Sequence, residues 1–382
     1  VACSVISGAA PTIVALVAAR IGQGLAAGCI APQNSGLIQQ MFSGSERARA
    51  FGLFGAIVSI STAVGPIAGG LILGLAGGPE GWRWIFFINL PIGLVALVLA
   101  ARLLPRGGTG ERRSRIDLLG VLLLGSAVFA VLLPLAQAES DGLRRLWWLF
   151  AVAVLPAVAF AMWERWLVRR GGDPLLDPRL LTQTPGFASG IALATAYFIG
   201  FSGVWLVFAL FFQTGLGDTP LQSGLAVTPF AIGSAVSSAV GGWLVVRLRR
   251  WVTVIGLAAA TVGFAATAVV LLLVPVSHVL WAVGIPLLVG GLGGGLVISP
   301  NITMTLRKVP VQLAGSAGGA LQTGQRVGAA IGTAALPGIY YMVLTATEGN
   351  VRFAVAAALA GAVAAIIGAL VLAVLELRND TH

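Results

Sequence analysis

The sequence predicts an all-α membrane protein whose helices cross the bilayer many times. Of its 382 residues, 58% are hydrophobic and only 9% are charged, whereas soluble domains carry about 25% charged residues. The charged residues cluster and leave long uncharged stretches between them, and a run of about 18 or more apolar residues is the signature of a membrane-spanning helix. The 52 glycines fit this class, because small residues let membrane helices approach closely.

Eleven segments are long enough to span about 30 Å of hydrocarbon, which takes roughly 20 helical residues. Residues 1–9 resemble the end of a further helix whose beginning is missing, so we expect an N-terminally truncated chain. The eleven segments lie near residues 12–40, 50–76, 84–103, 117–137, 146–166, 186–213, 220–246, 251–274, 279–305, 312–342 and 352–376.

Alternate connections between these segments collect basic residues, which predicts their orientation. One set holds seventeen, namely Arg47, Arg49, Arg102, Arg106, Arg112, Arg113, Arg115, Arg165, Arg169, Arg170, Arg179, Arg247, Arg249, Arg250, Arg307, Lys308 and Arg378. The other set holds four, namely Arg83, Arg144, Arg145 and Arg352. Because cytoplasmic loops are enriched in Lys and Arg, we expect the loops around 106–115 and 165–179 to be cytoplasmic. The loops around 138–143 and 346–351 are then extracytoplasmic.

The charge and the composition also exclude several function classes. The net charge of +10 does not indicate a nucleic-acid partner, because topology explains basic residues in short loops. Cys3 and Cys29 lie in apolar helical sequence, which favours packing over a disulfide or a metal site. A membrane-embedded enzyme would need a buried Asp, His or Cys cluster or a His-Glu-x-x-His motif, and the sequence has neither. We therefore expect no catalytic residue, no metal and no cofactor.

Arg20 is the first polar anomaly, because it lies inside a long uncharged segment. A charge at the centre of a membrane helix costs at least about 2.5–3.5 kcal/mol. The spacing of Arg20, Gln23 and Gly24 places them on one helical face. This arrangement predicts that Arg20 is buried on a transport path, where it pairs with an acid or a backbone carbonyl. An arginine near the interface that extends its side chain towards water is the alternative.

A second feature is a run of small residues in the next segment, formed by Gly52, Ser61, Gly65, Pro66, Gly69 and Gly70. Small residues at this spacing make a smooth face for close helix contact, and a proline removes a backbone hydrogen bond and bends the helix. Ordinary packing of small residues, without a transport role, is the alternative.

The two halves of the chain also share a sequence echo. Within one predicted span, the glycine-rich segment from Gly22 reaches Pro32 and Asn34, and within another the segment from Gly290 reaches Pro300 and Asn301. Both are expected to run inwards, so the echo predicts a parallel repeat of the kind that relates the halves of many transporters.

Together these motifs resemble those of the major facilitator superfamily, in particular its 14-helix drug:proton antiporters of the EmrB/QacA type. The arginine followed by Gln-Gly is similar to the motif of that family's fourth helix, and the run from Gly52 to Gly70 is similar to its antiporter motif, with Ser61 in place of a glycine. The segments Trp82-Arg83-Trp84-Ile85-Phe86 and Asn89-Leu90-Pro91-Ile92-Gly93 are also typical of the family.

The resemblance implies the major facilitator fold, with two pseudo-symmetric helical halves and an inserted helix pair. Residues 1–104 would form an incomplete N-terminal half, residues 105–180 the inserted pair with its cytoplasmic loops, and residues 181–382 a six-helix C-terminal half. The chain would begin within the family's third helix.

This sequence departs from the family pattern in its acidic residues. Where the family commonly has an Asp in a loop motif of the C-terminal half, this chain has Val246, so we expect no carboxylate to latch the cytoplasmic gate there. All thirteen acids fall in loops or at helix ends, and proton coupling normally needs a titratable group in the membrane. The sequence therefore predicts that the coupling acid lies outside this chain.

Further polar residues are candidates for the substrate path or for gating. Gln322 and Arg326, with Thr323 and Gln325, give one helical turn unusual polarity, which predicts a contact in the central cavity or, as the alternative, a polar seam between helices. Asn34 and Asn301 are candidates of the same kind, as are Gln39 and Gln222.

The expected function is proton-coupled efflux of hydrophobic small molecules by alternating access, as multidrug or natural-product export. A proton-coupled uptake permease of the same fold is the alternative. The expected partners are the substrate, protons and the lipid bilayer. We expect a monomer in the plasma membrane of a bacterium.

Overall fold

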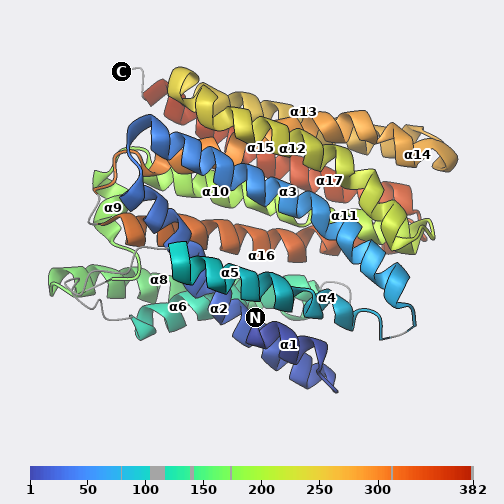
Figure 1. Ribbon diagram of the computed structural model, residues 1–382, viewed down its shortest axis with the longest axis horizontal. Helices are drawn as coiled ribbons and strands as arrows, with labels where there is room; N and C mark the ends of the chain where they lie inside the picture. The colour runs from blue at the N-terminus through green and yellow to red at the C-terminus, as the bar shows by residue number, and fades with distance from the viewer. Residues whose placement is uncertain (79, 104–116, 138–141, 173, 311–312, 380–382) are drawn as a thin grey trace.

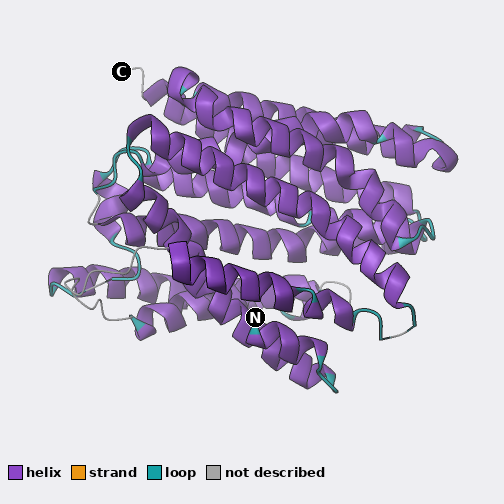
Figure 2. Cartoon of the chain, viewed as in Figure 1, coloured by secondary structure: helices purple, strands orange, loops and turns teal. Residues whose placement is uncertain are grey.

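Helices account for every regular element in the described part of the chain (Figure 2). The computed structural model describes residues 1–78, 80–103, 117–137, 142–172, 174–310 and 313–379 (Figure 1). The predicted loop 106–115 and most of the predicted loop 138–143 lie outside these residues. The all-α class expected from composition is confirmed.

The N-terminal helices contain the two motifs found in the sequence. They are α1 (Ala2–Gly8), α2 (Ile13–Met41), α3 (Gly44–Ala76), α4 (Arg83–Phe87) and α5 (Asn89–Leu103). The side chain of Thr12 caps α2 by accepting a hydrogen bond from the amide of Ala15, a standard way to satisfy a free donor at a helix start. No residue of α4 or α5 is buried, and an apolar helix that is exposed all round is suited to lipid.

A helical hairpin and a C-terminal bundle follow. The hairpin consists of α6 (Leu118–Ala136) and α8 (Trp148–Arg169), joined through the short α7 (Gly142–Arg145). The bundle consists of α9 (Pro178–Gln183), α10 (Phe187–Ser202), α11 (Val204–Ala209), η2 (Leu210–Gly215), α12 (Pro220–Leu248), α13 (Trp251–Leu273), α14 (Val276–Ala282), α15 (Gly284–Leu306), α16 (Ala314–Ala346) and α17 (Val351–Asn379).

All eleven predicted spans correspond to a helix or to consecutive helices. By length and apolar composition, ten described segments could cross a membrane, and α3 adds a continuous helix of 33 residues. Three spans are interrupted where a single helix was expected: α4 gives way to α5, α10 continues through α11 into the π-helix η2, and α14 gives way to α15. In each case the consecutive helices together still provide an apolar segment long enough to cross a membrane.

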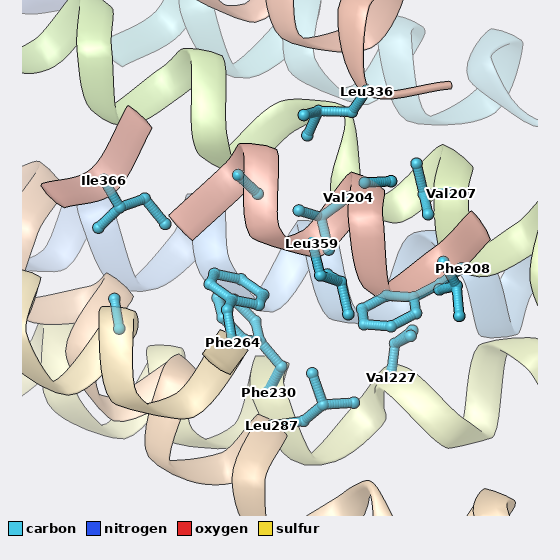
Figure 3. Packing of buried hydrophobic residues seen from close by; sticks show 14 of the residues in the cluster. Val204, Val207, Phe208, Val227, Phe230, Phe264, Leu287, Leu336, Leu359 and Ile366 are labelled. Carbon is cyan, nitrogen blue, oxygen red and sulfur yellow. The ribbon is translucent and has the colours of Figure 1, made fainter. Parts of the chain in front are cut away.

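The apolar core lies in the C-terminal bundle. Val204, Phe208, Phe230 and Leu359 are at most 1% exposed and come from α11, α12 and α17. Phe230 lies beside Phe264 of α13 (Figure 3), with ring centroids 5.6 Å apart and nearly parallel rings. Lipid tails are as apolar as these side chains, so moving the side chains from lipid into the bundle gains little hydrophobic free energy. The van der Waals contacts of this close packing hold the bundle together instead.

Successive long helices run in opposite directions, so their connections alternate between two ends of the bundle (Figure 1). The arginine-rich connections before α3, around α9 and after α12 lie at the end that also carries the C-terminus. The connections before α4 and α14 lie at the opposite end. This arrangement accommodates the two predicted sets of loops, and the assignment of one end to the cytoplasm is a prediction.

Single-cysteine labelling tests that assignment. With Cys3 and Cys29 replaced by alanine, Ser277→Cys should react with a membrane-impermeant maleimide in intact cells, because Ser277 is exposed at the end predicted to be extracytoplasmic. Thr182→Cys on α9, also exposed, should react only after the cells are opened. Labelling of Thr182→Cys from outside would reverse the predicted orientation.

Candidate functional site

The polar face of α2 is built from Arg20 and Gln23, as the spacing predicted. The Arg20 guanidinium donates a hydrogen bond to Oε1 of Gln23 at 2.7 Å, and Nε2 of Gln23 donates to Oγ of Ser4 on α1 at 2.9 Å. The guanidinium also lies 5.7 Å from the ring centroid of Phe86, a cation–π distance. The expected burial is not seen, because Arg20 is exposed, and a methyl group built on Gly24 would contact nothing within 4 Å.

The other predicted path residues do not join this group. Arg326 and Asn34 are exposed, whereas Gln322 and Asn301 are buried. No described hydrogen bond connects Arg20 with Asn301 or Arg326. The predicted residues lie on α2, α15 and α16, and α2 packs against α16.

Asn301 ties α15 to α10. Its side-chain amide donates to the carbonyl oxygen of Gly190 at 3.1 Å, and its Oδ1 accepts a hydrogen bond from Thr305 at 3.4 Å. Gly190 allows this approach, because a methyl group built on it would lie 2.0 Å from Oγ1 of Thr305. Asn301 is 6% exposed, and a buried amide with partners is a structural bond between helices.

A buried ion pair lies near Asn301. Arg250, just before α13, pairs with Glu376 of α17, and their side chains are 13% and 9% exposed. Oγ of Ser189 on α10 donates to Glu376 at 2.6 Å. Val246 lacks a carboxylate, as the sequence shows, but the structure brings another carboxylate to this end of the bundle. Glu376 supplies one from a distant segment.

At the opposite end, two arginines bind backbone carbonyls in the same way. Arg83 of α4 donates to the carbonyl oxygens of Gly8 and Ala10 at 2.8 and 2.7 Å. Arg352 of α17 donates to those of Leu272 and Val274 at 3.4 and 2.5 Å. In both cases the accepting carbonyls end a preceding helix, where they have no intrahelical donor. Two of the four arginines predicted to be extracytoplasmic therefore act as helix caps.

The small-residue motif of α3 forms a seam with α12, which lies alongside it (Figure 1). A methyl group built on Gly52 would lie 3.0 Å from the Cα of Gly242, one on Gly55 would lie 3.1 Å from the Cβ of Ser299 on α15, and one on Gly70 would lie 2.9 Å from the Cα of Leu221. We call Gly52, Gly55 and Gly70 the glycine seam. It brings backbones together near both ends of α3.

Gly65 and Gly69 do not share this role. A methyl group built on either would meet no atom within 4 Å, and Ser61 is exposed. The described residues therefore show no close packing at the centre of the motif. Gly55, which is not part of the motif, takes part in the seam instead.

Comparison with known proteins gives the family. A family model described as Major Facilitator Superfamily matches residues 1–333 and 190–381. The chain is 33% identical over 353 residues to a probable actinorhodin transporter of Streptomyces coelicolor, covering 90% of this chain and 59% of that protein. It is 33% identical to the multidrug resistance protein Stp of Mycobacterium tuberculosis, covering 90% of this chain and 62% of that protein.

It is also 34% identical to the puromycin resistance protein pur8 of Streptomyces alboniger, covering 87% of this chain and 65% of that protein. The chain thus spans less than two thirds of the length of each of these relatives. The family match extends over nearly all of the chain, and the helical architecture agrees with it. The protein therefore belongs to the major facilitator superfamily of membrane transporters.

Proposed function

We propose that the protein exports hydrophobic small molecules in exchange for protons, as a drug:proton antiporter of the 14-helix type. The glycine seam carries this proposal. Alternating access proceeds largely by rocking of one helical bundle against another, and small residues let α3 stay close to α12 while the bundles move. Relatives named for actinorhodin, puromycin, tetracenomycin C and multidrug resistance support export of antibiotic-like compounds.

The proposed organisation has two related halves, residues 1–104 and 181–382, with residues 105–180 inserted between them. The carbonyl-binding arginines support it, because Arg83 binds the end of α1 from α4 just as Arg352 binds the end of α13 from α17. The two arginines are separated by nearly the same number of residues as Asn34 and Asn301 in the sequence echo. A parallel repeat would produce this correspondence.

The proposed location is the plasma membrane of a bacterium. There the protein would act as a monomer that binds its substrate and protons and needs no cofactor. The large side chains exposed on α5 and α8, such as Leu94, Val95, Leu155 and Met162, are suited to contact with lipid. A proton-coupled uptake permease of the same fold is the alternative.

Inverted membrane vesicles from an efflux-deficient bacterial host test the direction. Vesicles containing the full-length protein should accumulate a hydrophobic fluorescent dye when respiration acidifies their lumen. They should release it when a protonophore collapses the gradient. Vesicles without the protein provide the background. If the dye accumulated in intact cells but not in inverted vesicles, the protein would be an uptake permease and not an exporter.

The same assay tests Arg20 and Arg326. Arg20→Ala and Arg326→Ala should each strongly reduce dye accumulation while leaving membrane insertion intact, because removing a charge makes insertion easier. Arg47, a cation of α3 outside the predicted path, offers a matched control as Arg47→Ala. Near-normal accumulation by both Arg20→Ala and Arg326→Ala would assign these arginines to the interface rather than to the transport path.

A further inference from the structure

The hairpin of α6 and α8 holds two carboxyl groups that the proposed transport mechanism does not use. Asp117 precedes α6, and Glu164 lies near the end of α8, only 1% exposed. Oδ1 of Asp117 accepts hydrogen bonds from the amide of Gly120 and from Nε1 of Trp163, both at 2.9 Å. Oε2 of Glu164 accepts one from the amide of Leu176 at 3.1 Å. One oxygen of each group is therefore satisfied.

The remaining two oxygens face each other. Oδ2 of Asp117 and Oε1 of Glu164 are buried and have no hydrogen-bond partner among the described residues. Both lie within 2.8 Å of the point that a methyl group on Gly120 would occupy, and the two carboxyl groups are within hydrogen-bonding reach. Ionised carboxylates only accept hydrogen bonds. Two ionised groups would therefore leave both oxygens unsatisfied and place two negative charges together.

Among the described residues, no ion pair offsets two charges here. The described ion pairs include neither Asp117 nor Glu164. Trp163 and the amide of Leu176 provide neutral donors. Asp177, next along the chain, is itself an anion: burial raises its pKa, but hydrogen bonds and charge from Arg179 outweigh burial and lower it. A proton between the two oxygens would satisfy both, because a protonated carboxyl group donates a hydrogen bond.

We propose that Glu164 and Asp117 form a proton-binding site, in which one carboxyl group stays protonated at neutral pH and donates a hydrogen bond to the other. The bound ligand is a single proton, and no covalent bond other than O–H is made or broken. The shared proton joins the start of α6 to the end of α8, while the Leu176 amide ties the segment before α9 to the same site. Loss of the proton leaves two adjacent anions, which weakens the packing of the hairpin.

Infrared spectroscopy of the full-length protein in lipid tests this directly. The wild type should show the carbonyl band of a protonated carboxylic acid, sensitive to deuterium exchange, which disappears as the pH is raised. Glu164→Gln should lose the band, because it removes one of the two carboxyl groups that share the proton. Asp117→Asn should also lose it at neutral pH, because the asparagine amide donates to Glu164 and removes the neighbouring charge. Glu46→Gln, at an exposed site on α3, should leave the band unchanged.

Two outcomes would overturn the proposal. A band that persists in Asp117→Asn would show that Glu164 is protonated by burial alone and shares nothing. Wild-type spectra with only ionised carboxylate bands, or with bands that move with sodium concentration, would show two anions or a bound cation instead. The titration of the wild type needs no variant, so the test survives if a substitution prevents folding.

Thermal unfolding provides a second test, because the proposal fixes the direction in which the melting temperature changes with pH. The folded protein holds a proton that the unfolded chain releases at the same pH, so the stability that the pair provides is lost as the pH rises. Wild-type melting temperature should therefore fall as the pH rises from about 4, where an unfolded Glu or Asp releases its proton, to the pH at which the folded pair releases its own. Glu164→Gln, whose amide donates permanently to Asp117, should lack that fall. An equal fall in the variant would contradict the shared proton.

Discussion

Replacing Gly52 or Gly70 with leucine is expected to abolish efflux while the protein still inserts and folds. The atoms nearest to the added side chains are backbone atoms, the Cα of Gly242 and the Cα of Leu221, which cannot move aside as a flexible side chain can. The helices α3 and α12 must therefore separate. Overpacking of this kind costs about 1–3 kcal/mol, which converts to a loss of about 5- to 150-fold in the population of any state that needs the seam closed.

The same helix provides the matched controls. Gly65→Leu and Gly69→Leu add the same side chain where a methyl group would meet no atom within 4 Å, so they should retain most of the efflux. Dye transport in inverted vesicles and the amount of folded protein in detergent would be measured for all four variants. If Gly65→Leu inactivates as fully as Gly52→Leu, close approach of α3 to α12 does not explain the motif.

Hydropathy predicted where the membrane helices lie, because each must present an uninterrupted apolar length to lipid. It could not predict the breaks within three spans. The sequence is equally apolar on both sides of Gly203, where α10 ends and α11 begins. There the backbone of α16 approaches so closely that a methyl group on Gly203 would lie 2.1 Å from the carbonyl oxygen of Gly332. Such breaks depend on the neighbouring helix.

The local part of the candidate site could also be predicted. Arg20 and Gln23 meet because residues three apart in a helix are neighbours, and this spacing can be seen in the sequence. The positions of Gly65 and Gly69 depend on how α3 is rotated against α12. Small residues surround much of the helix, so composition does not determine that rotation.

The partners of Glu376 and Glu164 could not be predicted from the local sequence. Glu376 and Glu164 lie near helix ends, where an acid is ordinarily solvated, and their partners come from other segments. A signal was nevertheless present, because Glu164 follows a long apolar stretch and immediately precedes Arg165. The side chain of an acid at the edge of a span can point into the protein if another segment places a hydrogen-bonding or charged partner there. That placement depends on the fold and is not visible in the local sequence.

Removing the carboxylate of Glu376 should strongly destabilise the C-terminal bundle. Glu376→Gln leaves the Arg250 guanidinium, 13% exposed, without its counter-charge, and breaking a buried pair by removing one partner costs about 3–5 kcal/mol. The exposed pair of Arg83 and Glu80 provides the comparison, since Glu80 is 68% exposed and such pairs contribute about 0–1 kcal/mol. Thermal unfolding in detergent should therefore show a large decrease in melting temperature for Glu376→Gln and a small one for Glu80→Gln.

The double variant Arg250→Met with Glu376→Leu separates the pair from its burial. Replacing both partners by apolar side chains of similar size leaves no charge unpaired, and such exchanges are often neutral or stabilising. The double variant should thus recover most of the stability that Glu376→Gln loses, although Ser189 loses its acceptor at 2.6 Å. Transport should not recover with it if this ion pair must open and re-form as the end of the bundle moves. Equal decreases for Glu376→Gln and Glu80→Gln would instead show that the pair is hydrated and contributes no more than a surface contact.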